Sequence, residues 1–131
     1  MLLRDIYLSA LRFLAESTDE GDNTDYEDRA PYILANLCCE LQGIDGTLRK
    51  ILGKAAASIP DAVYLPLDSE FPLLPRFSGI AALYLAAMLI LDDNSSLSDS
   101  LYDKYCDAVS SVCSSVESVC ESVKDVYFGN E

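Results

Sequence analysis

The stretch LSDSLYDKYCDAVSSVCSSVESVCESVKDVY, residues 97–127, decides the fold class of this chain. Its apolar residues recur at steps of three and four, which is the spacing of the a and d positions in a heptad repeat. The residues of this row are Tyr102, Tyr105, Val109, Val112, Val116, Val119, Val123 and Val126. Such a row has to be covered, so the sequence predicts a long amphipathic helix that packs against its own core or against a partner.

A second row with a period of seven runs beside the first and occupies the e positions. Its residues are Cys106, Cys113, Cys120 and Tyr127. We call the two rows together the C-terminal seam and interpret it as a candidate packing or oligomer interface. A two-stranded coiled coil favours Leu at d and opposite charges at e and g, whereas g here is Ala108, Ser115 and Ser122. The seam therefore indicates close packing, either within the chain or on a neighbouring subunit.

Apolar periodicity upstream of this helix predicts an all-α fold with about five helices. The expected helices span residues 2–16, 25–42, 46–58, 76–91 and 97–127. Thr24 and Glu27 have the form of a capping box at the start of the second helix, where Pro31 either kinks the first turns or marks a later start. Gly43 is expected to end this helix, and Asp45 to cap the third. The last helix has its own capping signal in Ser96 and Asp99.

Residues 60–75 differ from the helical segments because prolines 60, 66, 72 and 75 interrupt them. They are too apolar for a free linker, so the sequence predicts an ordered, extended crossing pinned to the helices. The helix that follows is apolar on nearly all sides, which places it at the centre of the fold. We expect a single helical domain over residues 1–131.

The composition excludes several classes of protein. The chain has 22 acidic and 9 basic residues, a net charge of -13, so we expect no grip on nucleic-acid phosphates. An acidic surface would let DNA pass without sticking, although ordinary solubility explains the charge equally well. The longest apolar run, residues 80–91, is shorter than the roughly 20 residues of a membrane span, and we find no signal peptide.

The usual catalytic and metal-binding patterns are missing as well. With no histidine, the common general base is absent. Asp92 and Asp93 are typical of a solvated turn, and the acidic stretch 19–25 lacks the order of a calcium loop. The five cysteines lack the Cys-x2–4-Cys spacing of zinc sites. We therefore expect that the protein is not an enzyme and binds no metal and no cofactor. The alternative is an enzyme that uses carboxylates and a metal ion.

Three segments resemble a known family. They are YLPLDSEF at 64–71, ALYLAAMLILDD at 82–93 and LYDKY at 101–105, and together they span residues 64–105, about a third of the chain. In this order they resemble the head-tail connector, or head completion, adaptors of tailed phages and prophages. The resemblance implies a small all-helical virion assembly protein that forms a ring below the portal and packs against copies of itself and other phage structural proteins.

The same resemblance implies a location in the bacterial cytoplasm during assembly and in the virion afterwards. It does not extend past Tyr105, so the Ser, Val and Cys-rich end of the last helix is interpreted from its periodicity alone. The alternative is a cytosolic helical interaction module, such as a regulator or chaperone, that offers the C-terminal seam to a host partner.

Overall fold

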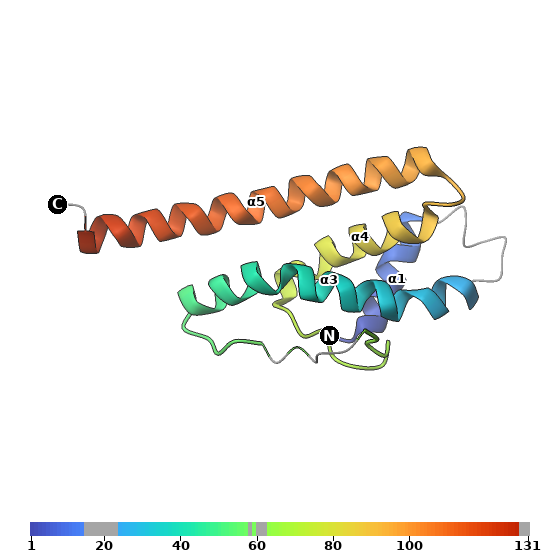
Figure 1. Cartoon of the computed structure of the whole chain (residues 1–131), viewed down its shortest axis with the longest axis horizontal. Coiled ribbons are helices and arrows are strands. Elements are labelled where there is room, and N and C mark those ends of the chain that lie inside the picture. The colour runs from blue at the N-terminus through green and yellow to red at the C-terminus, as the bar shows by residue number, and fades with distance from the viewer. Residues whose placement is uncertain (15–23, 58, 60–62, 129–131) are drawn as a thin grey trace.

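The computed structural model describes the backbone of residues 1–14, 24–57, 59 and 63–128, and their side chains except those of Thr24 and residues 116–128. Over these ranges the chain is mainly helical and forms no strand. The helices are α1 (Leu3–Phe13), α3 (Thr24–Ile51), η1 (Pro75–Phe77, a 3-10 turn), α4 (Ser78–Ile90) and α5 (Ser95–Phe128) (Figure 1). The helical fold class is confirmed, whereas the described residues hold four α-helices instead of about five.

Helix α1 starts beside the extended crossing and is stabilised by it. The Asp5 carboxylate accepts a hydrogen bond of 3.1 Å from the Leu2 N–H at the helix start. The N–H groups of Leu3 and Arg4, which have no partner within the helix, donate to Ser69 and Leu67 carbonyls at 3.0 and 2.8 Å. The crossing thus caps α1. The helix ends at Phe13, earlier than the predicted residue 16, and the Leu14 N–H donates to the Leu11 carbonyl at 2.9 Å.

Helix α3 corrects the prediction of separate helices over 25–42 and 46–58. Gly43 and Gly46 lie inside one continuous helix, and each costs about 1 kcal/mol relative to alanine. Burial of Leu41 and Leu48 on the core side outweighs that cost. Asp45 is accordingly an interior residue of α3 and not the cap of a third helix.

The true end of α3 is set by Gly53. Its φ of +71° lies in the left-handed region that favours glycine. The Gly53 N–H donates to the Lys50 carbonyl at 3.1 Å and the Lys54 N–H to the Arg49 carbonyl at 2.7 Å, which is a Schellman motif. A glycine does end this helix, ten positions later than the glycine that the sequence favoured.

The other end of α3 begins at Thr24 and includes Pro31 in its interior. A later start at Pro31 is therefore wrong. The Pro31 carbonyl accepts a hydrogen bond of 3.2 Å from the Leu65 N–H, which fixes the crossing to the side of α3. The Glu27 carboxylate, expected in a capping box with Thr24, pairs with Arg4 of α1.

The crossing, described from residue 63, has no helix before Pro75 and bends in a turn at residues 67–68, where the Ser69 N–H donates to the Pro66 carbonyl at 3.0 Å. It also joins the chain start, because the Phe71 N–H donates to the Met1 carbonyl at 2.8 Å and Leu2 forms an isolated antiparallel bridge with Glu70. Its apolar side chains enter the core: Leu65, Leu67, Phe71, Leu73 and Leu74. The crossing thereby shares one core with residues of α1, α3, α4 and α5.

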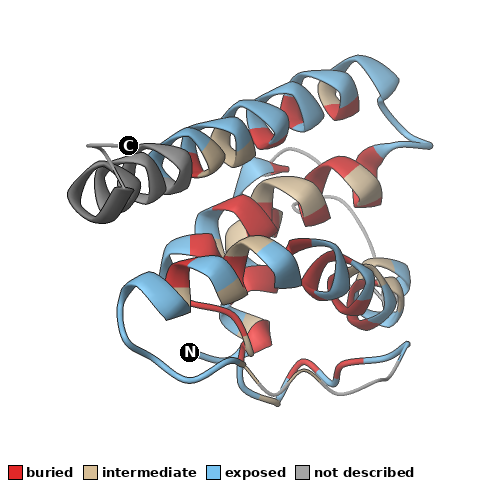
Figure 2. Ribbon diagram, turned by 60° about the vertical axis from the view of Figure 1, so that its left-hand side comes forward, coloured by how far each residue is buried: buried red, intermediate tan, exposed pale blue. Residues whose placement is uncertain are grey.

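Helix α4 is the central helix, as its all-round apolarity predicted. It contacts α1, α3 and α5, and Figure 2 shows it mostly buried between them. Its buried residues are Ile80, Ala81, Ala82, Leu85, Ala86, Ala87, Leu89 and Ile90. The many alanines let neighbouring helices approach closely.

Helix α5 begins one turn after α4 and folds back along it. The cap is Asn94 and not Ser96, because the Asn94 Oδ1 accepts a hydrogen bond of 3.0 Å from the Leu97 N–H. With 34 residues, α5 is about 51 Å long. Figure 1 shows it running past the ends of α3 and α4, so the C-terminal part of the helix projects beyond the other helices.

Candidate protein interface

The side chains of the C-terminal seam are described as far as Cys113, and they do not share one environment. Tyr105 and Val112 are buried, and Val109 and Cys113 are half-buried. Tyr102, 41% exposed, and Cys106 face solvent. The rest of the seam lies outside the described side chains: Val116, Val119, Cys120, Val123, Val126 and Tyr127.

The face of α5 that packs on α4 is centred on the d positions of the heptad and extends toward the g positions. Leu101, at a g position, is buried, and Ala108, the next g position, is partly buried against the core. The e row, which the sequence placed on the packing face, begins with the exposed Cys106. Figure 2 shows the same division, with the side of α5 toward α4 buried and the opposite side exposed.

Ser98 contributes a polar contact to the same face of the helix. It is buried and donates a hydrogen bond of 2.8 Å from its hydroxyl to the Ala87 carbonyl of α4. Sequence reasoning missed Ser98, although it stands one heptad before Tyr105 in the d row. A buried serine that satisfies a helix carbonyl holds α5 in one register against α4.

Three tyrosines surround the point where α5 meets α3 and α4. The ring of Tyr105 lies 5.0 Å from that of Tyr84 and 5.6 Å from that of Tyr102. Its hydroxyl donates to the Glu40 carboxylate at 3.3 Å. Burial, and then the nearby Glu40 charge, raise the pKa of Tyr105 well above its ordinary value. The phenol therefore stays protonated and continues to donate this hydrogen bond at physiological pH.

The cysteines whose side chains the structure describes are the buried Cys38, the half-buried Cys113 and the exposed Cys39 and Cys106. Cys38 is buried, and burial raises the pKa of its thiol to about 12, so it is an inert thiol near neutral pH. In the part of the chain that the structure describes, no three His, Cys, Asp or Glu side chains are arranged to hold a metal ion.

The acidic turn between α4 and α5 is exposed, as its sequence predicted. Asp92 and Asp93 are both in contact with solvent. The Asp93 carboxylate accepts a hydrogen bond of 3.0 Å from the Tyr26 hydroxyl, which ties the turn to the start of α3. Its visible role is structural.

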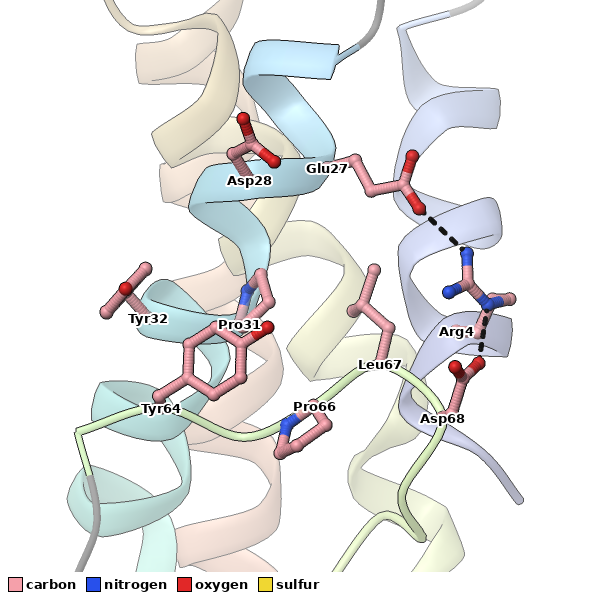
Figure 3. A pocket seen from close by; sticks show the side chains of 9 residues that line it. All are labelled: Arg4, Glu27, Asp28, Pro31, Tyr32, Tyr64, Pro66, Leu67 and Asp68. Atoms are coloured by element: carbon pink, nitrogen blue, oxygen red, sulfur yellow. Dashed lines mark hydrogen bonds and ion pairs between the residues drawn. The ribbon is translucent and has the colours of Figure 1, made fainter.

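A pocket of about 450 Å³ opens between α1, α3 and the crossing (Figure 3). At one side Arg4 joins the three segments, with its Nε 3.0 Å from the Asp68 Oδ1 and its Nη1 3.1 Å from the Glu27 Oε1. At the other side the rings of Tyr32 and Tyr64 stand edge to face. No sequence pattern pointed to this pocket, because its residues come from segments that are distant in the chain.

A second hollow of about 450 Å³ adjoins the first and lies between α3 and α4. Tyr32 lines both hollows. The other apolar residues of this groove are Ile33, Tyr84, Met88 and Leu91. Beside them, the Arg29 guanidinium donates to the Met88 carbonyl at 3.2 Å. The exposed face of α3 thus offers a charged pocket and an apolar groove side by side.

The comparison with known proteins found no relative of this chain. No protein-family model matches this chain, and neither a curated protein nor a solved structure matches it. Among the described residues, no helix has both the length and the apolarity that crossing a bilayer requires.

Proposed function

We propose that this chain is a non-enzymatic phage or prophage virion assembly protein, a head-tail connector-like subunit that forms a ring. The observation that carries the proposal is the length of α5, which extends beyond the other helices. The helix packs on its own core through residues as far as Val112, and its backbone then continues to Phe128. The apolar row of the sequence continues with it, through Val116, Val119, Val123 and Val126.

An apolar row on a projecting helix favours a second surface to cover it. Contiguous apolar surface is uncommon on monomeric proteins and is typical of subunit interfaces. In a ring, the end of α5 would pack against the neighbouring copy by the same contact at every step, which is a heterologous interface that closes. The resemblance of residues 64–105 to connector adaptors supports the same assembly.

The charge of the protein is compatible with this role. With a net charge of -13, the chain repels phosphate, as the wall of a channel that passes DNA requires. The proposal places the chain in the bacterial cytoplasm during assembly and in the virion afterwards, with other phage structural proteins as its neighbours.

Electron microscopy of the purified full-length protein, together with light scattering after gel filtration, tests the proposal. We expect rings, and we expect Val119→Glu with Val123→Glu to abolish them while the helical content is retained. Ser111→Glu with Ser114→Glu is the matched control, because both serines are exposed on the same helix. A strict monomer at high concentration, also in the presence of neighbouring phage proteins, would contradict the ring.

The second candidate is a helical interaction module that binds a host partner. The observation that favours it is the adjoining pocket and groove on α3, which meet at the exposed Tyr32. Such a module would remain monomeric by light scattering and form a one-to-one complex with its partner, and its gene would lie away from portal, terminase and capsid genes.

A further inference from the structure

The pocket between α1, α3 and the crossing combines open aromatic rings with negative charge. The rings of Tyr32 and Tyr64 have centroids 5.1 Å apart and planes at 68°, so they form two walls of a corner (Figure 3). Both side chains are accessible, with exposures of 55% and 45%. The face of a tyrosine ring attracts cations, and adjoining rings form the cages that bind ammonium groups.

The charges that line the pocket favour a cation. Glu27, Asp28 and Asp68 carry three negative charges and Arg4 one positive charge, which leaves a net charge of -2. Arg4 is already paired with Glu27 and Asp68. Asp28 has no ion-pair partner among the described residues, and it stands one helical turn before Tyr32. Side chains four apart on a helix are neighbours, so a cation on the Tyr32 ring is within reach of this carboxylate.

We propose that this pocket binds a lysine or arginine side chain from a basic segment of a partner protein. The aliphatic stem of such a side chain needs apolar contacts, and Pro31, Pro66 and Leu67 supply them along the pocket. A phosphate group is disfavoured by the net negative lining. The overall charge of -13 would also draw a basic partner toward the molecule from a distance.

This inference goes beyond ring assembly and does not depend on it. The pocket is built from α1, α3 and the crossing, whereas the proposed ring contact uses the end of α5. Loss of rings in the Val119 and Val123 variants therefore leaves peptide binding unchanged, and loss of peptide binding leaves rings intact. Either experiment can therefore give a negative result without affecting the conclusion from the other.

Fluorescence anisotropy with the full-length protein and labelled nine-residue peptides tests the pocket. The probes are glycine-serine peptides with two central arginines, two lysines or two glutamates. We expect the arginine and lysine peptides to bind and the glutamate peptide not to bind. Asp28→Asn should weaken binding about tenfold, which is the effect of losing one charge-assisted contact of about 1.4 kcal/mol. Tyr32→Ala should weaken it about fivefold through the lost cation–π contact.

Matched controls separate the pocket from general attraction to an acidic protein. Asp99→Asn removes an exposed acid of α5 and Tyr102→Ala an exposed tyrosine of the same helix, so both should leave the affinity unchanged. Equal weakening by Asp99→Asn and Asp28→Asn would overturn the proposal, because net charge alone would then hold the peptide. Circular dichroism verifies folding, and Tyr64→Leu replaces Tyr32→Ala if that variant unfolds.

Competition by small cations identifies the class of ligand. N-acetyl-arginine amide should displace the labelled peptide at lower concentration than choline does. Stronger displacement by choline would overturn the assignment to a protein partner, because a pocket for a quaternary ammonium ligand would then be the better description. Failure of the arginine and lysine peptides to bind at low ionic strength, where exposed charges attract most strongly, would overturn the proposal as well.

Discussion

The Asp45 carboxylate accepts a hydrogen bond of 2.8 Å from the Leu74 N–H, across 29 residues of sequence. Its second oxygen lies 2.8 Å from the Arg49 Nε, and the Asp45 side chain is only 1% exposed. Arg49 in turn donates to the Ala55 and Pro72 carbonyls at 3.3 and 3.2 Å. One partly buried ion pair therefore joins the end of α3 to both ends of the segment that leads into α4.

Asp45→Ala should lower the free energy of unfolding by about 3 kcal/mol, because it leaves the Leu74 N–H without an acceptor and removes the carboxylate that pairs with Arg49. Asp45→Asn should cost less, since its amide oxygen still accepts from Leu74. Urea denaturation followed by circular dichroism measures both. Asp99→Asn, at an exposed acid, is the control and should stay within about 0.5 kcal/mol of the parent. Equal stability of Asp45→Ala and the parent would contradict this role.

Tyr105 provides a test of how firmly α5 is held by its own chain. Tyr105→Ala should cost about 3–5 kcal/mol, because it empties the space beside Tyr84 in the core. Tyr105→Phe keeps the ring and removes only the hydrogen bond to Glu40, so it should cost about 1 kcal/mol. Thermal and urea unfolding give these values. If both variants unfolded like the parent, the contact of α5 with the other helices would be too weak to stabilise the fold.

Sequence periodicity was sufficient where burial depends on one element alone. The all-round apolarity of residues 80–91 predicted the centre of the fold, and the row through Tyr105 and Val112 predicted part of the packing face of α5. Periodicity was insufficient where a residue that is distant in the sequence determines whether a side chain is buried. Ser98 is polar, and its burial is possible because its hydroxyl donates a hydrogen bond to the Ala87 carbonyl of another helix.

The same physical reason explains the error over α3 and the missed pocket. Asp is favoured both as a helix cap and as a partner of Arg, and only the position of Leu74 shows which role Asp45 has. Gly43 resembles a helix terminator until the burial of Leu41 and Leu48 on either side is known. Arg4 pairs with Asp68, 64 positions away, and no local pattern encodes such a separation.

Alkaline pH should destabilise the protein through Cys38. The pKa of its thiol is raised from the ordinary 9.0 to about 12, chiefly by burial. Below pH 9 both folded and unfolded chains keep the proton; between pH 9 and 12 only the unfolded thiol loses it, so stability falls as pH rises. Urea unfolding between pH 8 and 10.5 should show a shallower decline for Cys38→Ala. Cys39→Ala, at the exposed neighbour, should decline like the parent; identical slopes for all three proteins would contradict the prediction.

The glycines of α3 should respond in opposite directions to alanine. Gly43 lies inside the helix, and a Cβ there would meet nothing within 4 Å, so Gly43→Ala should stabilise the protein by about 0.5–1 kcal/mol. Gly53 has equal space but a φ of +71°, so Gly53→Ala should destabilise it by about 1 kcal/mol through backbone strain. Since neither side chain gains or loses a contact, a difference in midpoint between the two variants reports backbone conformation alone. Stabilisation by Gly53→Ala would show that the Schellman motif does not end this helix in solution.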